Sequence, residues 1–294
     1  MTEPQSRRFR AGLVQLCSGR TVGPNLDRAE ALIRRAADGG AAYIQTPENT
    51  AMMELAPELV AASAETEEKS APLARLRALA KELGVWLHIG SLAVRLDEAR
   101  AVNRSYLIDP EGAIAARYDK LHMFDVDLAG GESYRESRYY ARGAKAVLAD
   151  LPFGRLGLSI CYDLRFPALY RALATAGAEF IAIPSAFTRQ TGEAHWRVLV
   201  RARAIETGAF MLAATQGGLH ENGRATYGHS IIVSPWGEVL AEGGEEPSVI
   251  FAEIDLAASA EVRARIPALK HGCDFEIEIV GPAGGDQPAK REAS

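Results

Sequence analysis

Cysteine, long apolar stretches and excess positive charge are all scarce in this chain of 294 residues. Its three cysteines, Cys17, Cys161 and Cys273, are odd in number and far apart, which excludes a disulfide framework and a Cys-x-x-Cys metal motif. The chain has 33 basic and 38 acidic residues, so its formal net charge is −5. This balance argues against nucleic acid or an anionic membrane as the main partner.

No apolar run reaches the ~20 residues that a transmembrane helix needs. The first apolar stretch, residues 11–17, is too short for the hydrophobic part of a signal peptide, and no cleavage site follows it. We therefore expect a soluble, cytoplasmic protein. Residues 281–294 are rich in Gly, Pro and charge, which predicts a disordered tail after a single domain over residues 1–280.

Motifs for metals, phosphates and a catalytic serine are missing too. The six histidines show no pair at metal-ligand spacing, and no glycine-rich loop has the spacing that binds phosphate. Residues 157–161 only partly match a serine nucleophile elbow, because Cys161 stands where the second glycine is needed. A Cys161–His195 dyad stays open at this point.

The most informative residue that is present is Cys161. Residues 156–160 before it are short and apolar, as in a buried strand, and residues 167–176 after it have the pattern of a helix with Pro in its first turn. The thiol is therefore expected at the carboxyl end of a strand, where α/β sheets bind ligands. The positive end of the following helix would favour the thiolate. The alternative is a buried structural cysteine, because free cysteine is among the most buried residue types.

The two halves of the chain share one order of elements: strand, helix, strand, second helix, third strand, hairpin. The first half is predicted to contain strand 11–17, helix 26–38 with Asn25 as its N-cap, strand 41–46, a helix capped by Ser70 and ended by Gly84, strand 85–92 and hairpin 103–118. The second half is predicted to contain strand 156–160, helix 167–176, strand 178–183, helix 195–207, strand 209–215 and hairpin 228–241. Two such units predict an α/β fold with two sheets packed face to face and helices outside, a four-layer α/β/β/α sandwich.

Two charged residues directly follow predicted strands of the first half. Glu48 lies just past the second strand, and Lys120 lies just past the hairpin. If the strand ends of both halves meet at one mouth, Glu48 lies beside Cys161. The alternatives are a turn or N-cap role for Glu48 and a solvated surface charge for Lys120.

Three segments around these residues resemble the Glu, Lys and Cys motifs of the nitrilase superfamily, the carbon–nitrogen hydrolases: residues 46–48, 119–122 and 161–167. The resemblance extends from about Arg10 to Ile266 and implies the same sandwich fold and a homodimer or larger homo-oligomer. Segments 184–187, 192–196, 201–206, 227–230 and 235–237 resemble the Nit branch, which contains ω-amidases and deaminated-glutathione amidases. Residues 270–280 depart from the basic, Tyr-containing end of the family, which leaves the C-terminal packing open.

The resemblance implies a role for each site residue. Cys161 attacks the amide carbonyl, Glu48 serves as base and then acid, and Lys120 stabilises the oxyanion together with the backbone N–H of Tyr162. Glu136 is expected to hold Lys120 and orient the amide, with Glu132 as the fallback for that role. This chemistry requires no metal and no organic cofactor.

The predicted reaction is hydrolysis of a small, carboxylate-bearing amide to acid and ammonia through a thioester, with deaminated glutathione as the favoured substrate. Arg165 and Arg189 are candidates to bind the carboxylate, with His195 beside the substrate, although structural ion pairs would explain these arginines equally well. An ω-amidase, an N-carbamoyl amidase, a nitrilase, a non-enzymatic binding protein on the same scaffold and a thiol redox protein are the alternatives.

Overall fold

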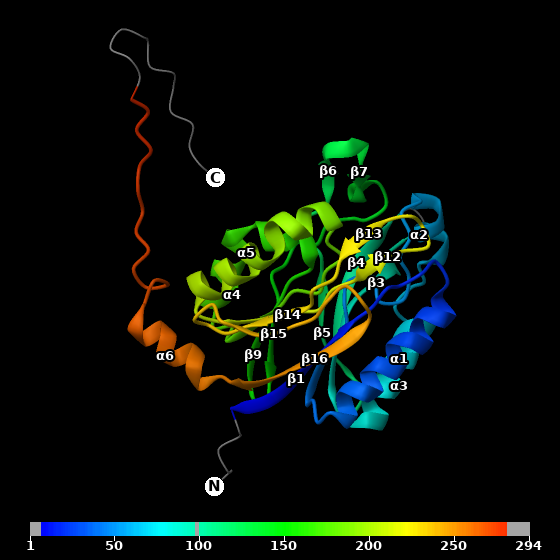
Figure 1. Cartoon of the computed structure of the whole chain (residues 1–294), viewed down its shortest axis with the longest axis horizontal. Helices are drawn as coiled ribbons and strands as arrows, with labels where there is room; N and C mark the ends of the chain where they lie inside the picture. The colour runs from blue at the N-terminus through cyan, green and yellow to red at the C-terminus, as the bar shows by residue number, and fades with distance from the viewer. Residues whose placement is uncertain (1–6, 98–99, 281–294) are drawn as a thin grey trace.

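Two six-stranded mixed sheets form the centre of the computed structural model, which describes residues 7–97 and 100–280 (Figure 1). The first sheet has the order β16 (Ser248–Asp255), β1 (Arg8–Gln15), β2 (Tyr43–Gln45), β3 (Trp86–Arg95), β4 (Ala101–Ile108), β5 (Ile114–Asp119). The second has the order β15 (Val239–Glu242), β14 (Ile231–Val233), β11 (Phe210–Ala213), β10 (Phe180–Ala182), β9 (Gly154–Leu158), β8 (Leu148–Leu151). The three central strands of each sheet, β1–β2–β3 and β9–β10–β11, are parallel. The two halves of the chain thus form matching sheets, as the repeated order of elements predicts.

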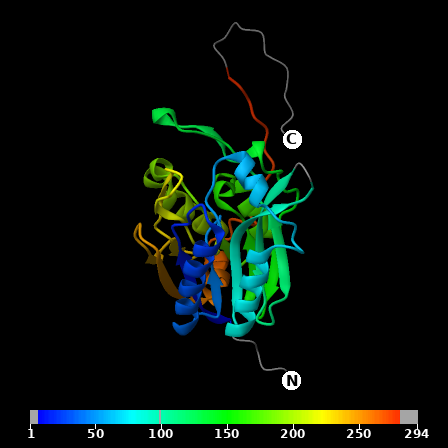
Figure 2. The same ribbon diagram turned by 90° about the vertical axis from the view of Figure 1, so that its right-hand side faces the viewer.

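Helices cover the outer face of each sheet. α1 (Val22–Asp38) and α3 (Ala71–Leu83) lie on the first sheet, and α4 (Pro167–Thr175) and α5 (Arg189–Thr207) lie on the second (Figures 1 and 2). Two further helices, α2 (Pro57–Ser63) and α6 (Ala257–Arg265), lie at the edges (Figure 1). The four-layer α/β/β/α sandwich is confirmed.

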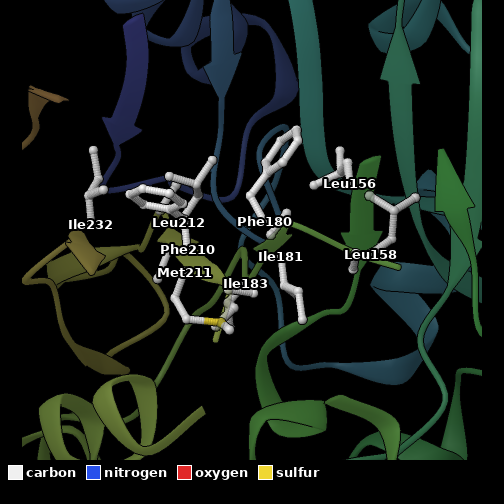
Figure 3. Packing of buried hydrophobic residues seen from close by; sticks show 14 of the residues in the cluster. Leu156, Leu158, Phe180, Ile181, Ile183, Phe210, Met211, Leu212 and Ile232 are labelled. Carbon is white, nitrogen blue, oxygen red and sulfur yellow. The ribbon is translucent and has the colours of Figure 1, made fainter. Parts of the chain in front are cut away.

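Alternation along the strands divides the apolar side chains between two layers of the core. Figure 3 shows two sets of side chains on the second sheet that point in opposite directions, one toward the first sheet and one toward the helices: Leu156, Phe180 and Leu212, against Ile181, Ile183 and Met211. Between the sheets Phe9 stacks on Phe153 with ring centroids 4.0 Å apart and lies 5.3 Å from the ring of Phe180. This shared apolar layer joins the two halves of the chain.

Two helix starts differ from the sequence-based expectation. α1 begins at Val22, and the N-cap position is taken by Thr21 instead of Asn25. The Asn25 side chain bonds to the N–H and C=O of Gly19 and to the C=O of Ala51, at 2.7, 2.8 and 2.9 Å, so it holds two loops together. α5 begins at Arg189, six residues before the expected start at His195, because Thr188 accepts a hydrogen bond from the Thr191 N–H and caps it. The Ser70 cap and the Gly84 end of α3 are confirmed.

Several elements were not expected from the sequence. β16 pairs antiparallel with β1 along its whole length, which returns the end of the chain to the first sheet. Two small hairpins, β6 (Asp125–Asp127) with β7 (Ser133–Arg135) and β12 (Gly217–Leu219) with β13 (Ala225–Tyr227), flank the mouth at the strand ends. Within the described ranges no helix is long and apolar enough to cross a membrane.

The C-terminal part of the chain leaves the body of the molecule after α6. Residues 271–280 form neither helix nor strand and extend outward (Figures 1 and 2), with the side chain of Phe275 82% exposed. The predicted disordered tail, residues 281–294, lies outside the described residues.

Candidate active site

Cys161 lies at a sharp turn between β9 and the second layer of helices. Its backbone has a φ of 49°, in the left-handed region that non-glycine residues rarely adopt. The Cys161 N–H donates to the Pro184 carbonyl at 2.9 Å, which ties the turn to the end of β10. A short 3₁₀ helix, residues Cys161–Arg165, follows, and α4 begins only at Pro167. The turn buries the thiol at the carboxyl ends of the parallel strands, where the sequence predicts it.

Glu48 reaches the same place from the loop after β2. The loop is fixed by its own hydroxyls: Thr46 Oγ1 accepts from the Gly90 N–H at 3.0 Å, and Thr50 Oγ1 donates to the Pro47 carbonyl at 2.7 Å. The Glu48 carbonyl also accepts from the side-chain amide of Gln216 at 3.0 Å. A loop held from both sides gives the buried Glu48 carboxylate a defined position.

Lys120 joins the two glutamates of the site. Its Nζ lies 2.8 Å from Glu48 Oε1 and 2.8 and 3.0 Å from the two carboxylate oxygens of Glu136. Asn103 on β4 supports the same pair, because its Nδ2 donates to Glu48 at 2.9 Å and to Glu136 at 3.2 Å. Glu136 is fixed further by the N–H of Phe124, at 2.7 Å. The side chains of Lys120, Glu48, Glu136 and Asn103 are all buried, and their hydrogen bonds form one connected network.

Burial and the neighbouring charges set the protonation of these groups. Burial raises the pKa of the Glu48 carboxyl, but the Lys120 ammonium opposes it, and the pKa ends below its ordinary value. Burial lowers the pKa of Lys120, whereas Glu136 and Glu48 raise it, and the pKa ends well above its ordinary value. Both groups are therefore charged at neutral pH.

The thiol behaves differently from the sequence-based expectation. Burial, and after it the Glu48 carboxylate, raises the pKa of Cys161, and the lowering effect of Lys120 is smaller. The expected preference for the thiolate is therefore absent in the free protein, and the thiol needs a base to activate it, as the mechanism implied by the resemblance requires. Cys161 and Glu48 line the same pocket and shift each other's pKa, so the carboxylate lies beside the thiol whose proton it would remove.

An open pocket of about 560 Å³ leads from solvent to the thiol. Its wall is largely aromatic, with Phe124, Tyr134, Tyr139, Tyr162 and Phe187 among the lining residues. The Tyr162 ring lies edge-on to Phe124, with centroids 5.2 Å apart. The expected position of Tyr162 at the pocket agrees with this geometry.

Four other expected site residues do not line this pocket. Arg189 is on the surface in an ion pair with Glu245 at 2.8 Å, and Arg165 packs over the Phe187 ring while it contacts His195 Nδ1 at 3.3 Å. Neither arginine lines the pocket, and neither does His195. The fallback Glu132 is exposed on the β6–β7 hairpin. These residues lie close to the motifs in the sequence, but in the structure their side chains contact residues other than the catalytic ones.

Sequence reasoning missed three residues of the site: Asn103, Asp163 and Arg224. Asp163, in the Cys161 motif itself, is fully buried, and Arg224, between β12 and β13, lines the pocket. The proximity of Asp163 to Cys161 was a usable signal, because a carboxylate two residues after a buried thiol requires partners. No comparable signal marks Arg224, because its hairpin was not predicted.

The carbon–nitrogen hydrolase family model matches residues 10–264, most of the chain. The chain belongs to the carbon–nitrogen hydrolase family. The resemblance of its Glu, Lys and Cys motifs to this family is thereby confirmed. A deaminated glutathione amidase of Yersinia enterocolitica is similar to this carbon–nitrogen hydrolase, with 40% identity over 262 residues that cover 88% of this chain and 91% of that protein.

Two solved structures show the same fold. The NitFhit protein of Caenorhabditis elegans aligns over 91% of this chain with a TM-score of 0.83 and 36% identity, and this chain spans 65% of that protein. An amidase from Nesterenkonia sp. AN1 aligns with a TM-score of 0.75 and 26% identity, over 90% of this chain and 99% of that protein. One structure of that amidase carries a covalent adduct, the acetamide moiety of fluoroacetamide, on its active-site cysteine.

Proposed function

We propose that this carbon–nitrogen hydrolase is an amidase that uses Cys161 as its nucleophile. One observation carries the proposal: a buried thiol lines one pocket with Glu48, whose Oε1 lies 2.8 Å from the ammonium of a buried Lys120. Acyl transfer needs a nucleophile, a base and a group that stabilises the oxyanion. The pocket provides a neutral thiol, a charged carboxylate and a cation for these roles. The cysteine adduct in the Nesterenkonia amidase supports the same role for a cysteine in a related fold.

The first half of the reaction forms a thioester. Sγ of Cys161 attacks the amide carbon while the thiol proton moves to Glu48, and the positive charge of Lys120 stabilises the negative oxygen together with the backbone N–H of Tyr162. The C–N bond then breaks, and Glu48 gives its proton to the departing nitrogen. Glu136 holds Lys120 in position throughout.

The second half hydrolyses the thioester. Water attacks the acyl carbon while Glu48 takes a proton from it, and the S–C bond breaks as the acid leaves. Glu48 returns the proton to Cys161, which restores the neutral thiol.

We propose deaminated glutathione as the substrate, on the strength of relatives that carry this name at about 40% identity over most of the chain. The amide of such a substrate joins the acyl half to a dipeptide, so hydrolysis releases an amine. Release of ammonia applies only to primary amides, such as 2-oxoglutaramate. Four compounds are tested: deaminated glutathione, 2-oxoglutaramate, a carbamoyl amino acid and an aliphatic nitrile. Mass spectrometry of the products then shows which of them the protein hydrolyses.

The decisive experiment pairs two conservative variants. Cys161→Ala is expected to stay folded and to lose amidase turnover by at least ~10⁴-fold, because the nucleophile is gone. Glu48→Gln is expected to lose turnover by ~10³-fold or more, yet Cys161 should still react with iodoacetamide, because removal of the carboxylate charge lowers the pKa of the thiol beside Lys120.

Circular dichroism and the melting temperature control for folding of both variants. Retained turnover in Cys161→Ala would overturn the proposed nucleophile. Full turnover in Glu48→Gln would overturn the proposed base.

We further propose that the protein is cytoplasmic and assembles as a homodimer or larger homo-oligomer, and that residues 1–280 act as one domain. Size-exclusion chromatography with light scattering measures the assembly. A mass equal to one chain of 31.6 kDa would contradict it.

A further inference from the structure

Arg224 places a positive charge in the wall of the catalytic pocket without an acidic partner. Its Nη2 donates to the Ala186 carbonyl, its Nη1 lies 3.8 Å from the sulfur of Met53, and its guanidinium lies 5.1 Å from the centre of the Tyr134 ring. Among residues 7–97 and 100–280 no carboxylate forms an ion pair with it. Its Nε is buried and has no hydrogen-bond partner among the same residues.

The carboxylates that line the same pocket are already occupied. Glu54 accepts from Arg20 at 2.6 Å and from the N–H groups of Leu55 and Ala56 at 2.8 and 3.1 Å. Glu48 and Glu136 share Lys120. A buried guanidinium nitrogen without a hydrogen-bond partner is costly, so an anion that enters the pocket and accepts from this guanidinium would lower that cost.

One residue, Ala186, connects this cation to the nucleophile. Its N–H lowers the pKa of Cys161 and so lies near the sulfur, and its C=O accepts from Arg224. Two hydrogen bonds and one residue separate the two groups, a span on the order of 10 Å or less. A carboxylate that is a few carbon atoms from the scissile amide fits this span.

We propose that Arg224 binds a free carboxylate of the substrate and restricts this enzyme to amides that carry one. The inference rests on the proposed amidase function and adds to it the residue that selects the substrate class. It also replaces Arg165 and Arg189, the expected anchors, with a residue inside the pocket. Nη1, Nη2 and Nε provide a planar set of donors, which is the geometry that recognises a carboxylate.

The test compares charged and neutral amides of similar size in the full-length protein. Succinamate against butanamide places the carboxylate on the acyl half, and N-acetylglycine against N-methylacetamide places it on the amine half. Arg224→Met is expected to lower kcat/KM for the charged member of at least one pair on the order of 100-fold, while the neutral member changes less than about threefold. The pair that responds identifies the half of the substrate that carries the carboxylate.

Arg189→Met makes the same chemical change at the surface and is expected to leave all rates within about twofold. Arg224→Lys should recover part of the charged rate, because it restores the charge without the planar geometry. Equal losses on charged and neutral members in Arg224→Met would overturn the inference and assign Arg224 a structural role.

A second measurement separates this inference from the proposed function. Alkylation of Cys161 by iodoacetate and by iodoacetamide, followed by peptide mass spectrometry, needs no amide turnover. The iodoacetate-to-iodoacetamide rate ratio is expected to fall on the order of tenfold in Arg224→Met, whereas it should not move in Arg189→Met. An equal iodoacetate-to-iodoacetamide rate ratio in the wild type and Arg224→Met would overturn the role of Arg224. If the ratio falls in Arg224→Met but the wild type hydrolyses no amide, only the proposed reaction is overturned.

Discussion

Asp163 is the side chain that connects the nucleophile to the lysine. Its carboxylate accepts from the Ile160 N–H at 2.8 Å, the Tyr118 hydroxyl at 2.6 Å, and the N–H and Nδ1 of His122 at 3.1 and 2.6 Å. Ile160 precedes Cys161, and His122 lies two residues after Lys120. One buried carboxylate thus braces the left-handed turn at Cys161, a conformation that costs on the order of 1 kcal/mol for a non-glycine residue.

We therefore expect Asp163→Asn to lower kcat by about tenfold or more and to reduce the free energy of unfolding by about 1–3 kcal/mol. The amide keeps the shape but replaces one acceptor oxygen by a donor, which leaves at least one buried N–H or O–H unpaired. Steady-state kinetics should show the loss in kcat more than in KM, because Asp163 does not line the pocket.

The rate of Cys161 alkylation, measured far below the melting temperature, tests positioning apart from stability. Asp150→Asn, at an exposed carboxylate that pairs with Arg155, is the matched control. Alkylation and kcat at wild-type values in Asp163→Asn would show that the turn does not depend on this side chain.

At this scale the sequence was informative where residues share a motif. Glu48, Lys120, Glu136 and Cys161 were predicted together, and the structure brings them within one network. Arg224 and Asn103 could not be predicted, because their contacts to the site depend on a hairpin and a strand register that no local spacing encodes. The raised pKa of Cys161 could not be predicted either, because burial and the nearby Glu48 carboxylate cause it.

At the scale of elements, β3 approaches the Glu48 loop so closely that only glycine fits at position 90. A Cβ on Gly90 would lie 2.2 Å from the Thr46 carbonyl oxygen and 2.4 Å from the Pro47 carbonyl. Both contacts are with backbone, which cannot rotate away. The Gly90 N–H also bonds to Thr46 Oγ1, so β3 fixes the loop that presents the base.

We expect Gly90→Ala to displace this loop, to lower kcat by about tenfold or more and to cost about 1–3 kcal/mol in unfolding free energy. Gly23→Ala is the matched control, because nothing lies within 4 Å of its Cβ position in α1. That variant should keep its activity, and its unfolding free energy should change by no more than about 1 kcal/mol, because the helix preference of alanine opposes the contact of its methyl group with the ring of Pro24. Wild-type kcat in Gly90→Ala, measured by steady-state turnover, would mean that the loop tolerates the shift.

Local sequence signals were reliable for helix ends that have a side-chain cap, as at Ser70. They were misleading at Asn25, whose side chain hydrogen-bonds to two loops and does not cap the helix. The sequence alone does not distinguish these two roles of an asparagine. The edge strand β16 was missed because its partner, β1, lies at the other end of the chain. Its pairing is a long-range property of the fold.

At the scale of the whole molecule, the two sheets are joined by polar contacts as well as by the apolar layer. Gln45 on the first sheet donates to the Leu212 carbonyl on the second at 3.0 Å. Behind it, His88 is fully buried between the Tyr43 hydroxyl at 3.0 Å and the Ser105 hydroxyl at 2.5 Å. These polar contacts are specific, so we propose that the two halves unfold as one unit.

Burial lowers the pKa of His88 to about 3 and that of His220 to about 4, so both are neutral in the folded protein. The unfolded chain binds a proton at each histidine below pH ~6.5, so stability falls as the pH drops from ~6.5 toward these lowered values. Each histidine is expected to contribute about 2 kcal/mol to the loss of unfolding free energy between pH 7 and 5.

Urea unfolding at the two pH values measures this loss. His88→Gln keeps a donor and an acceptor but cannot bind the proton, so its pH-dependent loss should be about 2 kcal/mol smaller than that of the wild type. A loss of equal size in both proteins would show that His88 does not titrate on unfolding.

Ala186 has a consequence for how this site is studied and how it can change. Both of its contacts with the site are made by the main chain, the N–H toward Cys161 and the C=O toward Arg224. An alanine scan leaves such a residue untested, and in saturation mutagenesis every substitution except proline keeps both the N–H and the C=O. Side-chain variation at this position therefore tests the space around the methyl group and not the link between nucleophile and anchor. Replacement of its amide by an ester through semisynthesis would remove the N–H while every side chain stays in place.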